Sequence, residues 1–453
     1  MKKKLLVINA VGLTKSLIES HSVFLKEICS SNTLSYLTPP IPAVTCTSQS
    51  NMLTGKDPSE HGIVANGWYF RDLSQILLWR QSNHLVQCPK IWDVIKERHP
   101  EFTTAKMFWW YNMYANTEYS VTPRPIYRSD GSKQPNSYAH PPDLNDSIKS
   151  ELGPFPLFHF WGPMTSIKST QWIADATIKI MREKNPNLCL TYLPHLDYNL
   201  QRIGSKHPDI KKDVEELDQI IKQLYSAAND NNYETIIVSE YGIQEVNTPI
   251  HINRILRQEG FITPTIELGE EHPDPGASKA FAMADHQIAH IYIKNKKDIQ
   301  PIKLLLDKHP HIDNVLDQDE QKDLHLNHSR SGELIALAKK NAWFTYYYWL
   351  DDNKAPDFAR TVDIHKKPGY DPVELFMTKN GKQKAAWTIL KKKLGFRYLL
   401  DIIPLDANLV KGSHGVLTSQ KEDGPLLISN NQFNSNASLN MKDIFHLIDS
   451  YFA

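Results

Sequence analysis

The segment TCTSQSNMLTGKDPSEHGI, from Thr45 to Ile63, joins a run of small polar residues to two successive turn signals. We expect a short helix that begins at Thr45 and ends at Thr54-Gly55, because glycine adopts the left-handed backbone conformation that often terminates a helix. The turn from Pro58 to Gly62 then returns the chain to its sheet. Backbone N–H groups at a helix start attract anions. This order would suit a catalytic nucleophile held at the helix start, the position of Thr45.

Size and charge limit the classes of function to consider. The chain has 453 residues, enough for one large α/β domain with an insertion or for two to three ordinary domains. It carries 51 Lys and Arg against 51 Asp and Glu, so no overall positive field favours nucleic acid or anionic lipid. The overall composition gives no support for a local patch of positive charge. No apolar run reaches the length of about 18 residues that predicts a membrane-spanning helix. We expect neither nucleic acid nor a membrane as a partner.

The first residues, MKKKLLVINAVGLTKSL, place three lysines before an apolar run, a pattern also found in secretory signals. Here Asn9 interrupts the apolar run, Lys15 ends it, and no small-residue cleavage motif follows directly. A buried strand from Leu5 to Ile8 is the favoured interpretation. The four cysteines are widely spaced and form no C-x-x-C pair, which favours reduced thiols and a cytoplasmic protein. They are Cys29, Cys46, Cys88 and Cys189.

Short apolar runs alternate with helical patterns along the chain. A helix is predicted between the second and third runs, where Val214, Leu217 and Ile221 share one face. Strand, helix and strand in succession predict an α/β fold with a mainly parallel central sheet and helices on both faces. The runs with the length and composition of buried strands are Leu5–Ile8, Leu188–Leu193, Thr235–Ser239 and Ala289–Ile293.

Two segments depart from this alternation. Residues Val121–Ser147 are rich in proline, serine and asparagine and are expected to form a long loop. Residues Asn341–Phe376 are rich in aromatics and prolines. They form either an inserted cap over a pocket or the core of an outer subdomain or dimer surface, and composition favours neither. A homodimer therefore stays among the expected partners.

Polar residues follow the predicted strands where each strand ends. In a parallel sheet, ligands bind beyond the carboxyl ends of the strands, so we expect these side chains to converge with Thr45 at one sheet edge. The residues at these positions are Asn9, Asp197, Gln201, Glu240 and Tyr241, with His414 in a later KGSHG segment.

The order of these residues resembles the alkaline phosphatase superfamily, and within it the type I phosphodiesterase and nucleotide pyrophosphatase branch. In that branch a nucleophilic threonine begins a short helix that ends in Thr-Gly, and a proline and His-Gly-Ile follow. Here Thr45 is followed by Thr54-Gly55, Pro58 and the run from His61 to Ile63. The resemblance implies an alkaline phosphatase-like core in residues 1–245 and 401–453. The remaining core strands and a cap or wall region would occupy residues 246–400.

The first turn after Thr45 supplies the candidate phosphate-binding residues. These are Thr47 and Ser48, of which Ser48 stands where the family usually has an asparagine that holds the transferred phosphoryl oxygen.

Members of this family bind two zinc ions, and this chain departs from the family pattern at several ligand positions. Asn9 stands in place of an aspartate, Gln201 in place of a histidine, and Glu240-Tyr241 in place of an Asp-His pair. Asp197 and His414 are kept. Zinc prefers thiolate, imidazole and carboxylate ligands, whereas these oxygen donors suit Mg²⁺, Mn²⁺ or Ca²⁺ better, and only weakly.

The expected cofactor is one or two divalent ions, Zn²⁺, Mg²⁺, Mn²⁺ or Ca²⁺, with less than two equivalents of zinc. Other residues are lesser candidates for completing such a site, although a polar residue satisfied by backbone or water is the more common state of each. They are His195, His286, Asp363 and His365.

The resemblance and the retained Thr45, Asp197 and His414 favour a metal-assisted hydrolase of a phosphodiester, phosphomonoester or related ester. Thr45 would form a phosphothreonine intermediate, and the substrate would be a small phosphorylated metabolite. The replaced ligands favour an alternative, a metal-poor homologue of weak or no activity that binds a phosphorylated or acidic metabolite. A phosphoryl transferase or mutase on the same core is the third hypothesis.

Overall fold

The computed structural model of the chain describes residues 3–129, 133–396, 398–430 and 438–453. At its centre lies a nine-stranded sheet with the strand order β23-β2-β22-β11-β1-β10-β5-β6-β9. Five adjacent strands are parallel: β11 (Glu234–Val238), β1 (Leu5–Ala10), β10 (Leu188–Leu193), β5 (Thr104–Met107) and β6 (Tyr119–Pro123). The flanking strands are β22 (Leu426–Ser429), β2 (Thr33–Thr38), β23 (Leu439–Asn440) and β9 (Ser137–His140). The prediction of a mainly parallel central sheet is confirmed.

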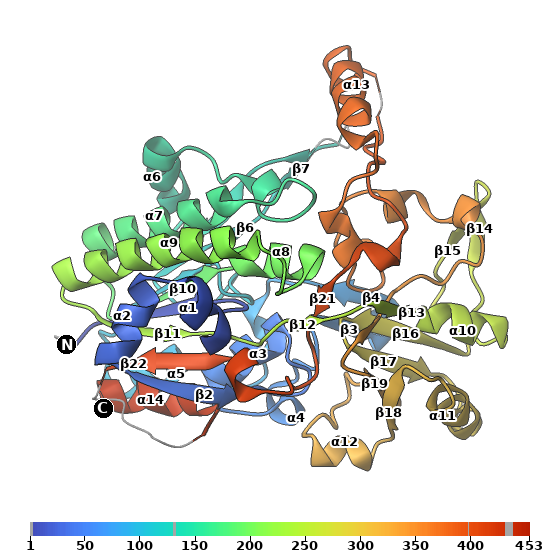
Figure 1. The fold of residues 1–453 in the computed structure, drawn as a ribbon, viewed down its shortest axis with the longest axis horizontal. Coiled ribbons are helices and arrows are strands. Elements are labelled where there is room, and N and C mark those ends of the chain that lie inside the picture. Colours follow the sequence, from blue (N-terminus) through green and yellow to red (C-terminus); the bar gives the residue numbers. More distant parts are fainter. Residues whose placement is uncertain (1–2, 130–132, 397, 431–437) are drawn as a thin grey trace.

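Helices cover both faces of this sheet (Figure 1). The pair α7 (Ile167–Lys184) and α9 (Ile210–Asp230) lies along one face, and α5 (Ile91–Arg98) and α14 (Asp443–Phe452) lie along the other. Every residue of β1 and β10 is buried, as expected for strands that are covered on both sides. Every strand of the sheet comes from residues 1–245 or 401–453.

One predicted strand belongs to a different sheet. Ala289–Ile293 falls in β17 (Ile288–Ile293), which lies in an antiparallel sheet of order β16-β17-β19-β18. The reason is local, because the chain reverses directly after β16 (Ala280–Asp285), with His286 in the left-handed conformation at φ 60°. The two strands form a tight hairpin, so β17 pairs with its neighbour in sequence rather than with β11. The other strands of this sheet are β18 (Ile312–Leu316) and β19 (Leu334–Ala338).

The prediction of a long loop at Val121–Ser147 is largely wrong. This segment contains the end of β6, all of β9 and the start of α6 (Asp143–Leu152). Strands β6 and β9 pair antiparallel at the sheet edge and bury Val121 and Ala139. Long-range pairing and burial therefore override a composition that is typical of loops. Between them, β7 (Ile126–Tyr127) and β8 (Lys133–Gln134) extend the hairpin outward.

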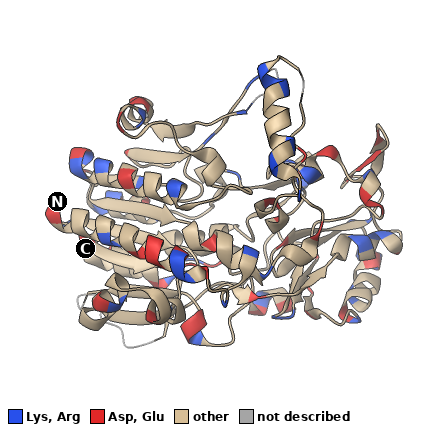
Figure 2. Cartoon of the chain, turned by 45° about the horizontal axis from the view of Figure 1, so that its top comes forward, with Lys and Arg blue, Asp and Glu red and all other residues tan. Residues whose placement is uncertain are grey.

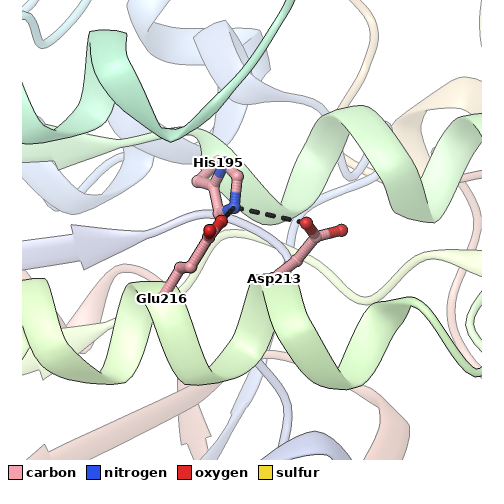
Figure 3. A group of neighbouring side chains, drawn as sticks. All are labelled: His195, Asp213 and Glu216. Carbon is pink, nitrogen blue, oxygen red and sulfur yellow. Dashed lines mark ion pairs between the residues drawn. The ribbon is translucent and has the colours of Figure 1, made fainter.

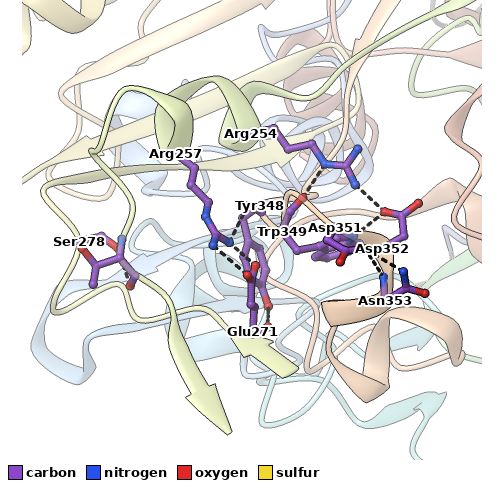
Figure 4. Close-up of polar contacts among 10 residues, drawn as sticks. Arg254, Arg257, Glu271, Ser278, Tyr348, Trp349, Asp351, Asp352 and Asn353 are labelled. Carbon is purple, nitrogen blue, oxygen red and sulfur yellow. Dashed lines mark hydrogen bonds and ion pairs between the residues drawn. The ribbon is translucent and has the colours of Figure 1, made fainter. Parts of the chain in front are cut away.

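The aromatic-rich segment Asn341–Phe376 packs in a second apolar core beside the antiparallel sheet. Its strand β20 (Ala342–Phe344) pairs with β13 (Thr248–Ile250), and its largest aromatic side chains are fully buried. Helix α10 (Ile252–Gln258) holds the segment through Arg254, which donates to the Trp349 carbonyl at 2.7 Å and pairs with Asp352 at 2.7 Å (Figure 4). The segment is thus a subdomain core, and its end also lines a cavity described below.

Helix α13 (Gly381–Lys393) projects away from the rest of the molecule (Figure 1). Neither α13 nor any other helix in the described parts of the chain combines the length and apolar character needed to cross a membrane.

Candidate active site

The segment from Thr45 to Ile63 folds as two short helices separated by a glycine turn. Helix α3 (Thr45–Thr54) ends at Gly55 with φ 67°, and α4 (Pro58–His61) ends at Gly62 with φ 74°. His61 braces the turn, because its Nδ1 accepts from the Ile63 amide at 3.0 Å and its Nε2 lies 3.0 Å from Asn51 Oδ1. Burial lowers the pKa of His61 to about 3, so the imidazole is neutral and Nε2 donates to Asn51.

A side chain already occupies part of the start of α3. The Cys46 amide donates to Asn66 Oδ1 at 3.0 Å. Asn66 is in turn fixed by Asp285, which accepts from the Asn66 amide at 2.8 Å and from Asn66 Nδ2 at 3.1 Å. The expected array of free N–H groups therefore lacks the Cys46 amide. This hydrogen bond fixes the backbone at Cys46, the residue directly after Thr45.

Thr45 stands at one end of a buried hydrogen-bond chain. The Tyr241 hydroxyl donates to Asp197 Oδ1 at 3.2 Å, and Thr45 Oγ1 lies 3.1 Å from the same hydroxyl. Because the Tyr241 proton is directed to Asp197, the Thr45 hydroxyl is the donor to Tyr241. Burial raises the pKa of Asp197 to about 7, against the opposing effect of hydrogen bonds from Tyr241 and Gln201. The chain links the Thr45 hydroxyl to a carboxyl group that changes protonation near neutral pH.

A second carboxyl group lies beside Thr45 in a network of amides. Glu240 Oε1 accepts from Asn9 Nδ2 at 2.6 Å and from Gln49 Nε2 at 2.7 Å. The side-chain oxygen of Gln49, Oε1, accepts from the Trp110 amide at 2.7 Å. Burial raises the pKa of Glu240 to about 8, so this side chain is mainly protonated at neutral pH. Its Oε2 and Asn9 Oδ1 are buried without a hydrogen-bond partner.

His414 closes the site through a stack of rings. The centre of its imidazole ring lies 3.6 Å from the centre of the Tyr241 ring, with 7° between the ring planes. It lies 3.7 Å from the centre of the His286 ring, with 36° between those planes. His414 Nδ1 donates to the Ala43 carbonyl at 2.7 Å, which leaves Nε2 unprotonated, since burial lowers the pKa of this histidine to about 3. Nε2 has no hydrogen-bond partner and lies 3.9 Å from Asp197 Oδ1.

The predicted convergence at the sheet edge is therefore observed. Gln201 joins it by donating to Asp197 Oδ2 at 2.8 Å while accepting from the Tyr370 hydroxyl at 3.1 Å. The two candidate phosphate-binding residues differ, because Thr47 Oγ1 is buried without a partner and Ser48 Oγ donates to the Glu240 carbonyl at 3.4 Å. The residues gathered around Thr45 are Asn9, Asp197, Gln201, Glu240, Tyr241, His286 and His414.

Three lesser candidates lie elsewhere. Asp363 pairs with Lys366 at 3.8 Å, and His365 lines the wall of the cavity described below. His195 begins α8 (His195–Ile203), but its Nε2 faces α9. There it lies 3.5 Å from Asp213 Oδ1 and 3.3 Å from Glu216 Oε2 (Figure 3).

The residues around Thr45 do not fit the family's pair of zinc ions. Asn9 and Gln201 direct amide N–H groups, and Tyr241 directs its hydroxyl, at the carboxyl groups that would hold the metal. A metal ligand has to present a lone pair, and the lone pairs left without a partner at the family's ligand positions belong to Asn9 Oδ1, Glu240 Oε2 and His414 Nε2, too few for two ions. Burial raises the pKa values of Asp197 and Glu240, and the hydrogen bonds that both carboxyl groups accept oppose this shift.

A large cavity leads to these residues. Its volume is about 1090 Å³, and Thr45, Asp197 and Tyr241 line its inner end. Most of the wall is aromatic or aliphatic, as at Trp79 and Trp110. Pockets of about 300–1,000 Å³ already enclose drug-sized ligands, so the cavity accommodates a substrate with a bulky apolar part.

Several residues of the site are absent from the sequence prediction. Gln49 lies four residues after Thr45 on the same helix, and that spacing could have indicated it. Tyr192 lies at the carboxyl end of the predicted strand Leu188–Leu193, and that position could have indicated it. Asn66 and Tyr370 have no comparable signal, because they reach the site from distant segments.

Comparison with known proteins identifies the family of this chain. The family model described as type I phosphodiesterase/nucleotide pyrophosphatase matches residues 5–371. The chain belongs to the type I phosphodiesterase/nucleotide pyrophosphatase family. An ectonucleotide pyrophosphatase/phosphodiesterase of Caenorhabditis elegans is 23% identical over 231 residues, which are 49% of this chain and 26% of that relative. The chain thus spans about a quarter of the length of this curated relative.

Solved structures share the fold of this family member at low sequence identity. A phosphonoacetate hydrolase from Sinorhizobium meliloti, solved in complex with phosphonoformate, has a TM-score of 0.64 at 13% identity. That alignment covers 100% of this chain and 96% of the hydrolase. Murine ectonucleotide pyrophosphatase/phosphodiesterase 5, solved as an inactive form with AMP, has a TM-score of 0.60 at 14% identity over 100% of this chain and 95% of that chain. The alkaline phosphatase-like fold is therefore shared along the whole chain.

Proposed function

We propose that this protein is a hydrolase of a phosphodiester, phosphomonoester or related ester, with Thr45 as the nucleophile. The observation that carries the proposal is the chain from Thr45 through Tyr241 to Asp197 at the inner end of the cavity. Membership of the phosphodiesterase family and the phosphorus-containing ligands of two structural neighbours support the choice of substrate.

Proton transfer along this chain would activate Thr45. As the Thr45 oxygen attacks, its proton passes to the Tyr241 oxygen and the Tyr241 proton passes to Asp197. A carboxyl group with a pKa of about 7 is matched to this role near neutral pH. The bond from phosphorus to the leaving ester oxygen breaks, and this oxygen takes a proton from solvent. Water then attacks the phosphothreonine and the bond from phosphorus to Thr45 Oγ1 breaks. Asp197 returns its proton to Oγ1 through Tyr241, and the proton of the attacking water passes to solvent. Glu240 also lies beside Thr45 and, when protonated, adds no negative charge next to an anionic substrate.

Turnover of an aryl phosphate and an aryl phosphodiester tests the proposal. The variant Thr45→Ala should abolish turnover and leave the melting temperature nearly unchanged, because it removes one hydrogen bond of about 1 kcal/mol. Thr47→Ala is the matched control, and its loss of a buried hydroxyl without a partner should leave most activity. Acid quenching followed by mass spectrometry should place the phosphoryl group on Thr45. Equal activity of the parent and Thr45→Ala would remove Thr45 as nucleophile.

A second candidate function is binding without turnover. The observation that favours it is that Asn9, Gln201 and Tyr241 donate hydrogen bonds to Glu240 and Asp197, the carboxyl groups at metal-ligand positions of the family. An inactive parent that binds a phosphorylated ligand tightly would move the assignment to this candidate.

We further propose that one divalent ion binds at the cluster of His195, Asp213 and Glu216 rather than beside Thr45. Ligand atoms about 2.1 Å from a tetrahedral ion lie about 3.4 Å apart. The His195 separations of 3.5 Å and 3.3 Å match this spacing, and both nitrogens of the buried imidazole have no hydrogen-bond partner. Asn199 Nδ2 donates to the other Asp213 oxygen at 2.7 Å and fixes that carboxylate. The ion would join α8 to α9.

A cytoplasmic location stays part of the proposal. Its support is that Cys29, Cys46, Cys88 and Cys189 are all free thiols in the structure.

A further inference from the structure

The mouth of the cavity carries a concentration of exposed apolar side chains. Eight of the large hydrophobic residues that the described structure exposes fall between positions 387 and 400, in α13 and the segment after it. Trp387 is 59% exposed and Phe396 is 64% exposed. Surfaces of soluble proteins rarely gather so many, and such patches mark contact with another apolar surface. The eight are Trp387, Ile389, Leu390, Leu394, Phe396, Tyr398, Leu399 and Leu400.

This surface is continuous with the wall of the cavity that ends at Thr45. Ile389 and Leu400 are exposed and also line the cavity. On another part of the rim, Tyr127, Phe158 and Met164 are likewise both exposed and cavity-lining. An apolar path therefore leads from the surface of α13 to the nucleophile.

The charge of the same segment has one sign. Between Leu375 and Leu400 the sequence contains no acidic residue. Figure 2 shows this as basic bands on the projecting helix. Lys391 Nζ lies 5.7 Å from the Trp387 ring centre, and Lys392 Nζ lies 5.4 Å from that of Tyr398. The lysines of the segment are Lys379, Lys382, Lys384, Lys391, Lys392 and Lys393.

We propose that α13, with Leu394 and Phe396, docks on an anionic lipid bilayer and admits an amphiphilic phosphoester with a long apolar group to the cavity. Segments that bind an anionic membrane surface combine Trp, Phe and Leu side chains with lysines, and both kinds of residue are exposed in α13 and directly after it. The balanced charge of the whole chain conceals this patch, which is why composition predicted no membrane partner. The substrate class rests on the proposed hydrolase function, whereas the docking does not.

A bilayer fits this surface better than a second copy of the chain does. Two copies of α13 packed face to face would bring lysines against lysines, with Lys384 as an exception because it pairs with Asp401 at 2.7 Å. An anionic membrane supplies both the negative charge for the lysines and the apolar layer for Trp387 and Phe396.

Sedimentation with lipid vesicles tests the docking. The intact chain should bind vesicles of phosphatidylcholine with roughly 30% phosphatidylserine at least tenfold more tightly than phosphatidylcholine alone, and salt of about 0.5 M should weaken the binding. The double variant Trp387→Ser/Phe396→Ser and the double variant Lys382→Ser/Lys391→Ser should each bind at least tenfold more weakly. None of these four residues lines the cavity. Leu268→Ser, at a site fully exposed elsewhere, and Lys296→Ser/Lys297→Ser are the matched controls and should bind like the parent.

Turnover of a water-soluble aryl phosphodiester separates this inference from the hydrolase proposal. Docking variants should keep the parent's turnover of the soluble ester and lose turnover of an ester presented in vesicles. A parent that binds anionic vesicles but hydrolyses no ester would keep the docking and overturn the substrate class. Absence of vesicle binding would overturn the docking. Light scattering that shows a dimer lost in Trp387→Ser/Phe396→Ser would assign the surface to a second copy instead.

Discussion

Glu240→Gln tests whether protons, rather than metal, balance the charge beside Thr45. Below about pH 5 the parent carries a neutral Glu240, and glutamine reproduces its shape, so the free energy of unfolding should be nearly equal in the two proteins. As the pH rises, the unfolded chain ionises near the ordinary pKa of 4.5, whereas the folded protein keeps its proton up to about 8. The folded state then holds the extra proton, so the parent loses stability as the pH rises through this range.

The size of the effect follows from the pKa difference. Each pKa unit corresponds to about 1.4 kcal/mol, so the shift from 4.5 to about 8 amounts to about 5 kcal/mol lost between about pH 5 and pH 9. Urea unfolding followed by tryptophan fluorescence, in chelator, measures it as the difference between parent and Glu240→Gln. The exposed Glu267→Gln is the control and should follow the parent at every pH. A difference between parent and Glu240→Gln that stays constant over this range would refute the reasoning and indicate an ionised Glu240 held by a cation.

Three further outcomes are expected. Tyr241→Phe removes the proton path to Asp197 and should lower turnover about 10²-fold or more with little loss of stability, and a variant with parental turnover would exclude the path. The purified parent should contain at most one equivalent of divalent metal by elemental analysis, and His195→Ala should lose it; two equivalents of zinc in the parent would contradict this. Lys367→Met should cost about 3–5 kcal/mol of unfolding free energy, because it leaves Asp371 and Glu374 without the buried lysine that lies 2.7 Å from each. The control, Lys366→Met at an exposed ion pair, should cost under about 1 kcal/mol.

Local patterns in the sequence predicted much of the sheet and helix framework. The strand Leu188–Leu193 and the helix around Val214 and Ile221 appear as expected, because a buried run and an amphipathic face are properties of neighbouring residues. The polar residues at the strand ends meet Thr45, since parallel strands bring their carboxyl ends to one edge.

Contacts between residues far apart in the sequence were harder to predict. His286 enters the site from a hairpin of the antiparallel sheet, and nothing in its own sequence neighbourhood indicates that its ring stacks on His414. The roles of Tyr241 and Gln201 depend on the direction in which each hydroxyl or amide donates. The sequence showed that the family's ligands are replaced, but the hydrogen bonds that take their place require side-chain positions.

The position of β22 has a consequence for the order in which the protein can be assembled. Strand β2, which precedes Thr45, reaches the parallel strands only through β22, near the far end of the chain. At about 5–20 residues per second, a ribosome needs roughly 20–80 seconds to travel from β2 to β22. Throughout that time the nascent chain has β2 and the Thr45 segment but lacks β22, the strand that joins β2 to β11. His414, too, emerges only late. Hydrolytic competence would therefore appear only after β22 has been translated, and chains terminated before that strand would be inert.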